Sequence, residues 1–314
     1  MAELNITSDV ASKLIDKVSD ALGGVLAPWQ TKRMADAEGR AAIIRAQADA
    51  QVRQIQAVAD IEAGDLQRRA ALRWVAEETR HQANMESITA QAIPLLGEEA
   101  KPEGMNDDWM SLFLHECRHT SEAEMQALWA KVLAGEANSP GSFSKRTLTT
   151  LAALSQQEAR WFSTLCCFIV VINDSWSSEA QPIVLALDDA LYQIEGMDFT
   201  LVSGLSAAGL ITYTVGGYSN YFVGSHGVQC TYFEGEFTLN PALESGGSYL
   251  PMGEVILSPV GQELARICKG SPVSGFMDYL RSAWRDEGFA MEITRIAPPP
   301  EPIVDDSSEY ELDY

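Results

Sequence analysis

The sequence predicts a mainly α-helical protein with a smaller α+β part towards its C-terminus. An apolar repeat of eleven residues early in the chain, followed by capped amphipathic segments, predicts the helical part. Aromatic-rich runs separated by Gly, Ser and Asn turns after residue 182 predict the α+β part. We expect an oligomerisation arm at 1–96, a helical domain at 105–172, an α+β domain at 173–290 and a disordered acidic tail at 297–314.

Composition limits the classes of function. The 314 residues carry a formal net charge of −22, which disfavours general binding to nucleic acid because phosphate backbones demand Lys and Arg. The five cysteines form no CxxC pair and are expected as free thiols. No signal-peptide pattern and no run of eighteen apolar residues is present, so we expect a cytoplasmic protein, with peripheral contact at the inner membrane as an alternative.

Residues 8–29 have the pattern of an amphipathic helix, with one apolar face. Its members are Val10, Leu14, Val18, Leu22, Val25 and Trp29. The simpler interpretation is a helix packed on a partner, and the alternative is an interfacial helix that contacts a membrane. Asp9, Asp16 and Asp20 on the polar face count against strong binding to anionic lipid.

Residues 30–92 lack proline and predict one long helix, or two helices with a break near Gly64. Small and aliphatic side chains recur at eleven-residue spacing, which is three turns at about 3.67 residues per turn, and so form a nearly straight stripe. The stripe contains Ala37, Ala41, Ile44, Ala48, Val52, Ile55, Ala59, Ala63, Leu66 and Ala70. We interpret it as a coiled-coil-like seam covered by another copy of the chain. The alternative is a helix that folds back on its own chain, and parallel and antiparallel packing stay open.

Residues 106–172 are helical in pattern. Ser121 with Glu124, and Ser155 with Glu158, have the spacing of capping boxes and predict two helix starts. Gly135–Ser144 contains Pro140 and predicts a loop between helices.

The C-terminal region predicts helices at Leu185–Glu195 and Thr200–Gly209, a strand at Leu210–Val215 and further strands before a helix at Pro259–Cys268. A helix ending in GLI, then hairpin material, then LSPVGQELARI is the order seen in winged-helix domains. No Lys or Arg occurs from Trp161 through Ala265, so a recognition helix here has no basic group for DNA. We therefore expect this region to bind a protein partner.

The segment from His115 to His119 spells H-E-x-x-H. On a helix, His115 and His119 lie one turn apart and could bind zinc, with Glu116 activating a water molecule. Arg118 places a cation inside the motif, and Ser121 starts a new helix almost at once. A zinc metallopeptidase is therefore an alternative function, and under the leading interpretation we expect no cofactor.

Ser144, Lys145 and Arg146 precede a predicted helix at Thr147–Leu154, where backbone N–H groups can hold an anion. The spacing of a phosphate-binding P-loop is absent. The simpler interpretation is a loop that joins two helices.

The segment SEAEMQALWAKVLAGEANSPGSFSKRTLTTLAAL, with the later GLI and LSPVGQELARI, resembles a bacterial family of uncharacterised proteins, domain of unknown function 2806. That resemblance implies no established activity. The stretch around LWAKVLA is also similar to the abortive-infection alpha family, which implies a role in defence against phage, often through a membrane.

The leading hypothesis is a non-enzymatic bacterial assembly protein, a homo-oligomer with a further protein partner, in phage defence. The alternatives are the zinc metallopeptidase and a membrane-acting effector.

Overall fold

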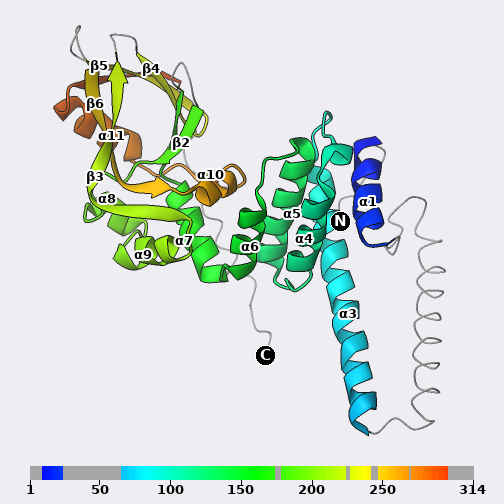
Figure 1. The fold of residues 1–314 in the computed structure, drawn as a ribbon. Coiled ribbons are helices and arrows are strands. Elements are labelled where there is room, and N and C mark those ends of the chain that lie inside the picture. Colours follow the sequence, from blue (N-terminus) through cyan, green and yellow to red (C-terminus); the bar gives the residue numbers. More distant parts are fainter. Residues whose placement is uncertain are drawn as a thin grey trace, which may run out of the picture. The chain divides into compact units, whose positions relative to one another are not determined.

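The structure is a computed structural model, shown in Figure 1. The chain divides into two compact units, Met1–Ala152 and Ala153–Tyr314. Residues 153–172, which the sequence analysis grouped with the helical domain, thus belong to the second unit. The structure describes residues 9–23, 65–173, 178–223, 227–241, 247–268 and 270–295.

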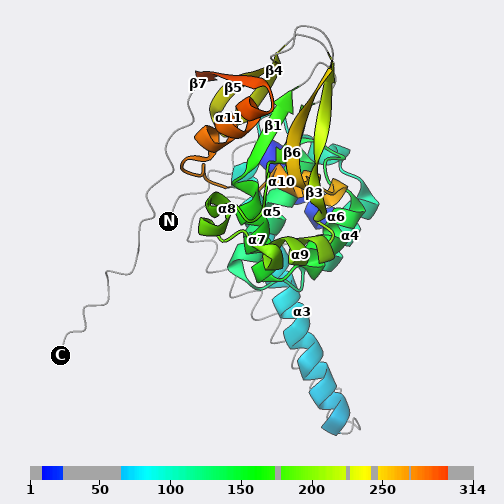
Figure 2. The ribbon, with the colours of Figure 1, turned by 90° about the vertical axis from the view of Figure 1, so that its left-hand side faces the viewer.

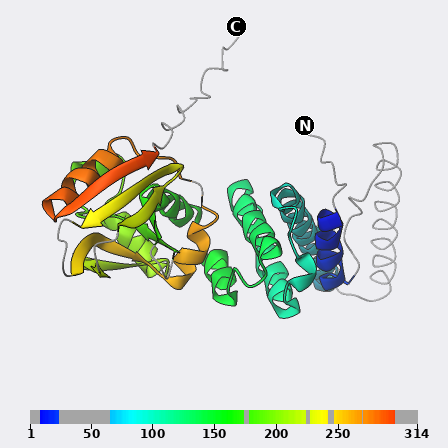
Figure 3. The same ribbon diagram turned by 90° about the horizontal axis from the view of Figure 1, so that it is seen from above.

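The first unit is helical over its described residues. Phe113 lies between two tryptophan rings, stacked on Trp109 at 5.3 Å and edge-on to Trp129 at 5.4 Å, and this aromatic group forms the centre of the core. Figure 3 shows the helices of this unit side by side, with α1 in blue. The α-helices are α1 (Asp9–Ala21), α3 (Asp65–Ala92), α4 (Asp107–Cys117), α5 (Ala123–Asn138) and α6 (Lys145–Ala153), and the 3-10 helices are Ile93–Leu95 and Pro102–Gly104.

The two halves of α3 have different surroundings. Its C-terminal half packs on α4 and α5 and buries Met85, Ile88 and Ala92. Its N-terminal half extends beyond the other described helices of the unit, as Figures 1 and 2 show. Leu66 and Trp74 in that half are 73% and 59% exposed.

The second unit combines short helices with two antiparallel sheets. One sheet has the strand order β2-β1-β4-β5-β7 and the other pairs β3 with β6. Figure 2 shows the long β3–β6 pair beside the smaller elements. The helices are α7 (Gln156–Cys166), α8 (Ala190–Ile194), α9 (Phe199–Ala207), α10 (Pro259–Ala265) and α11 (Phe276–Asp286). The strands are β1 (Ile169–Asn173), β2 (Ser178–Pro182), β3 (Ile211–Val223), β4 (Val228–Tyr232), β5 (Gly235–Pro241), β6 (Gly247–Leu257) and β7 (Phe289–Arg295).

Buried aromatic rings hold the helices of the second unit on its five-stranded sheet. Phe168 contacts Tyr192 and Phe276 with ring centroids 5.1 and 5.2 Å apart, and Phe276 also contacts Tyr232 at 5.1 Å. The hydroxyl of Tyr232 donates to the carbonyl of Cys167 and accepts from the N–H of Val273. These rings are buried, and their hydroxyls have partners, as buried tyrosines require.

Two predicted helix starts have different outcomes. The capping box at Ser155 is confirmed, because its hydroxyl accepts from the N–H of Glu158 and the Glu158 carboxylate accepts from the N–H of Ser155. The predicted box at Ser121 is wrong: α5 begins at Ala123 after Glu122, without a side-chain cap. The hydroxyl of Ser121 instead accepts a hydrogen bond from Asn84, which comes from the distant helix α3.

Several predicted elements are corrected in type or length. Ile169–Asn173 is a strand inside a region predicted as helical, because a short apolar run has no period that separates strand from helix. The predicted helix at Leu185–Glu195 is only Ala190–Ile194. The helix predicted at 8–29 ends at Ala21, before Gly23 in a left-handed conformation.

The coarse fold class is confirmed, since the structure is mainly helical with a smaller antiparallel β part. The acidic tail at 297–314 and most of the predicted arm lie outside the described residues. Within the described part of the chain, no helix is long and apolar enough to cross a lipid bilayer.

Candidate functional site

The H-E-x-x-H segment does not form one continuous helical face. Helix α4 ends at Cys117, and Arg118 closes it by donating its N–H to the carbonyl of Leu114. His115 lies in the last turn and His119 lies beyond the helix. Their ring centroids are 6.4 Å apart and their planes are nearly perpendicular.

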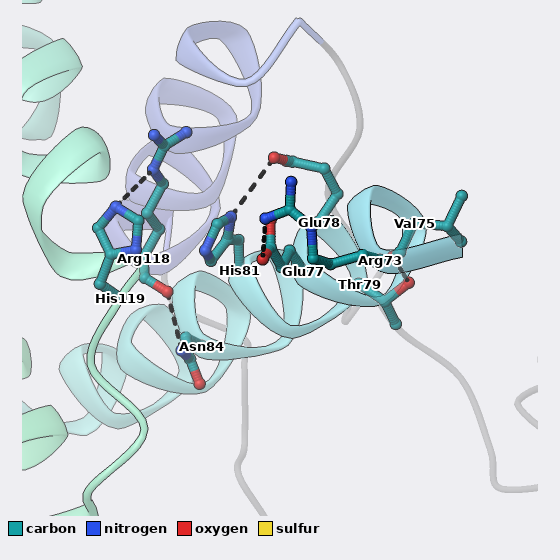
Figure 4. Close-up of polar contacts among 9 residues, drawn as sticks. All are labelled: Arg73, Val75, Glu77, Glu78, Thr79, His81, Asn84, Arg118 and His119. Atoms are coloured by element: carbon teal, nitrogen blue, oxygen red, sulfur yellow. Dashed lines mark hydrogen bonds and ion pairs between the residues drawn. The ribbon is translucent and has the colours of Figure 1, made fainter. Parts of the chain in front are cut away.

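A third histidine joins this group from helix α3. The buried ring of His81 meets the ring of His119 edge-on, with centroids 4.6 Å apart (Figure 4). Nδ1 of His81 lies 3.4 Å from a carboxylate oxygen of Glu78 but makes no hydrogen bond among the described residues. Nε2 of His119 accepts from Nε of Arg118 at 3.2 Å. The guanidinium of Arg118 thus occupies one of the two ring nitrogens through which His119 could bind a metal.

The electrostatics around His119 favour its neutral imidazole. Burial lowers the pKa of His119 below its usual 6.5, and the neighbouring His81, Arg118 and His115 lower it further. Among the residues that the structure describes, no group of three or more His, Cys, Asp or Glu side chains is placed to hold a metal ion.

Polar side chains join α3 to the turn between α4 and α5. Nδ2 of Asn84 donates to the carbonyl of Arg118 at 2.8 Å, as Figure 4 shows. The amide of Gln126 donates to Asn84 and to the carbonyl of Thr120. Because these groups are buried and hydrogen-bonded, they hold the histidine turn against α3.

The loop before α6 is organised by a carboxylate from the same chain. Buried Glu136 accepts from the N–H of Gly141 at 2.7 Å and from the N–H of Phe143 at 2.9 Å, one bond to each oxygen. The hydroxyl of Ser144 accepts from the N–H of Thr147, and Lys145 pairs with Asp108 at 3.4 Å. The arrangement supports the simpler interpretation, a loop that joins two helices.

Sequence reasoning missed the role of Glu136. Nothing in its surroundings distinguishes it from an ordinary helix carboxylate, because its partners are backbone N–H groups. Arg146, the last of the three predicted anion-binding residues, is exposed at the start of α6.

The predicted membrane face of α1 packs on its own chain. Leu14 and Val18 are fully buried, and Ala11 and Ile15 contact Ile93 in a small cluster. Helix α1 lies against α4 and the 3-10 helix Pro102–Gly104. Val10 and Leu22 are half-buried, and Val25 and Trp29 lie outside the described residues.

The last part of the predicted stripe lies on the exposed half of α3. Leu66 and Ala70 are exposed, as is Trp74, which follows at the same spacing of four. An eleven-residue step carries Leu66 to Ile88 through Glu77, and Ala70 to Ala92 through His81. The exposed and buried halves of α3 therefore share one face. The stripe residues from Ala37 to Ala63 lie outside the described residues.

The comparisons with known proteins identify a family without an assigned activity. No curated protein and no solved structure matches the chain. The model of the family described as "Protein of unknown function (DUF2806)" matches residues 68–281, from the exposed half of α3 through most of α11. This match spans well over half of the sequence, and the chain belongs to that family.

Proposed function

We propose that this chain is a non-enzymatic assembly protein that associates with further copies of itself through one face of α3. This α3 face is defined by Leu66, Ala70 and Trp74. The observation that supports this proposal is the exposure of Leu66 and Trp74, whose side chains are 73% and 59% exposed. Further along α3, the same face is buried in the core.

The energetics favour covering this face. Burying a large apolar side chain contributes about 1.5–3 kcal/mol, so two such residues give a driving force that a neighbouring copy can use. The small residue Ala70 between them lets a partner approach the helix axis closely. Charges on the rest of this half, such as the ion pair of Arg68 with Asp65, keep its other sides solvated.

The test is the mass of the native particle. We expect the full chain to form a particle larger than one copy at micromolar concentration, measured by light scattering. The double variant Leu66→Ser/Trp74→Ser should reduce that mass, because it removes both large apolar side chains of the face. Since both side chains are exposed, the substitutions should leave the fold intact. Leu72→Ser is the matched control, since Leu72 is 51% exposed on another side of the same helix. A monomeric wild-type chain would refute the proposal.

We also propose a partner-binding role for the second unit, which rests on the winged-helix order of its sequence. Helices α8 and α9 precede the β3–β6 pair, and Val184 bridges to Gly253 beside that pair. Helix α9 carries no Lys or Arg, which favours a protein partner over DNA. The role in phage defence follows from the abortive-infection resemblance and is tested by plaque counts on bacteria with and without the protein.

A further inference from the structure

The α9–β3 pair presents an exposed apolar patch on the second unit. Phe199, the first residue of α9, is 66% exposed and contacts the ring of Tyr213 with centroids 6.2 Å apart. Val215, two residues further along β3, is 84% exposed. We call Phe199, Tyr213 and Val215 the α9–β3 patch.

A β-bulge places Val215 in solvent. Tyr213 pairs with Val255 and Tyr218 pairs with Gly253, so residues 214–217 lie opposite Glu254 alone. Gly216 and Gly217 take left-handed conformations, with φ of 87° and 74°, that other residues adopt only at a cost. A bulge of this kind re-aims side chains, and here it leaves an aliphatic residue uncovered by the described part of the chain.

Carboxylates surround the patch. A carboxylate oxygen of Glu254 accepts from the N–H of Leu187 at 3.1 Å and from the hydroxyl of Tyr213 at 3.4 Å. Burial raises the pKa of Tyr213, and the charges of Glu254 and Asp188 raise it further, which places both carboxylates near its ring. Asp198 precedes Phe199 at the start of α9. With no Lys or Arg from Trp161 through Ala265, the patch is apolar with an acidic edge.

The α3 face has the complementary chemistry. Leu66, Ala70 and Trp74 lie at positions i, i+4 and i+8 of one helix stripe, and Arg69 and Arg73 lie beside them at i+3 and i+7, so the face combines apolar side chains with a basic edge. Arg69 and Arg73 pair with Asp65 and Glu77 on their own helix, at 3.2 and 3.0 Å. These ion pairs are exposed, and such pairs are worth about 0–1 kcal/mol, so the guanidinium groups can exchange partners at low cost.

We propose that the α3 face of one copy docks on the α9–β3 patch of another copy, with Arg69 and Arg73 facing the acidic edge. This inference rests on the proposed function and names the surface that covers the α3 face. Because the two surfaces differ, the contact is heterologous: each copy keeps a free helix face and a free patch, and assembly continues until a ring closes or a filament grows.

The experiment is a complementation of two full-length variants. Leu66→Ser/Trp74→Ser removes the docking helix face, and Phe199→Ser/Val215→Ser removes the patch at exposed positions. Leu72→Ser and Tyr221→Ser are the matched controls, since each removes an exposed apolar side chain elsewhere on α3 or β3. Circular dichroism establishes that every variant is folded, and sedimentation at micromolar concentration gives the masses.

A heterologous contact predicts that each double variant alone loses the assembly of the wild type. An equimolar mixture of the two should form a one-to-one dimer, because one intact helix face meets one intact patch. Both controls should keep the wild-type mass.

Three outcomes overturn the inference. If the patch variant assembles like the wild type while the helix variant does not, helix faces pair with each other and the proposed function stands without the patch. If both variants lose assembly and their mixture forms no dimer, the contact is not helix to patch. If Leu66→Ser/Trp74→Ser assembles like the wild type, the proposed function is wrong, and the docking of the α3 face on the patch is wrong with it.

Discussion

At the scale of single residues, the buried carboxylate of Glu136 is the clearest case of one side chain that holds a loop in place. Both of its oxygens accept backbone N–H groups, from Gly141 and Phe143. Glu136→Gln keeps the shape but turns an amide NH₂ towards one of these donors. We expect a loss of about 1–3 kcal/mol in the free energy of unfolding, since a buried donor is left without an acceptor.

Urea denaturation measures that loss, with Glu122→Gln as the control. Glu122 is exposed and provides no side-chain cap for α5. Equal stability of the Glu136 and Glu122 variants would show that the loop does not depend on the carboxylate.

The histidine cluster predicts a pH dependence of the first unit. The pKa of His119 in the folded protein lies below 6.5, the value expected when it is unfolded, so the unfolded chain binds the proton more readily. The stability that neutral His119 contributes is therefore fully present above about pH 6.5. It is lost as the pH falls from that value through the pKa of His119 in the folded protein. Between pH 7.5 and pH 5.5, His119→Asn should lose less stability than the wild type.

The exposed His115 provides the comparison for this effect. His115→Asn should change the profile less than His119→Asn, because His115 is one of several neighbours that lower the pKa of His119 and follows burial, His81 and Arg118 in size. The groups that face His119 are His81, Glu116 and Arg118 besides His115. A wild-type profile for His119→Asn in urea denaturation would contradict the assignment.

At the scale of elements, the contact between α7 and α9 depends on Gly204. A Cβ at this position would lie 2.5 Å from Cζ3 of Trp161. Gly204→Ala should destabilise the second unit, because overpacking costs about 1–3 kcal/mol and outweighs the gain in helix propensity of about 1 kcal/mol. Thermal unfolding measures this, and Ser203→Ala on the exposed side of α9 should be neutral. A neutral Gly204→Ala would mean that Trp161 moves aside freely.

Short sequence motifs predicted an element correctly where residues close in sequence decide its structure. The Ser155 cap formed as expected because both of its partners lie within one helical turn. The Ser121 cap did not form, because α5 begins at Ala123 with Glu122 at the N-cap position, and the Ser121 hydroxyl accepts from Asn84, far away in sequence. The glycine pair at 216–217 has the form of a turn signal, yet β3 continues through it as a bulge because β6 pairs on both sides.

At the scale of the whole molecule, two compact units with separate cores predict two unfolding transitions in calorimetry. Glu136→Gln should lower only the transition of Met1–Ala152, and Gly204→Ala only that of Ala153–Tyr314, since the partners named above for each residue belong to its own unit and independent sites add. If either variant shifts both transitions equally, the chain unfolds as one cooperative body.

Periodicity and composition determined the helical class, the acidic character and the apolar spacing of Leu66, Ala70 and Trp74 on α3, because these depend on which residue types recur along the chain. The arrangement of His81 with His119, the use of Glu136 in the loop and the meeting of Phe199 with Tyr213 came from long-range packing. A spacing such as H-E-x-x-H records what a helix could present. The next helix start, predicted near Ser121, already indicated that this helix stops near His119, whereas the contact of His119 with His81 on α3 comes from long-range packing that sequence neighbours do not encode.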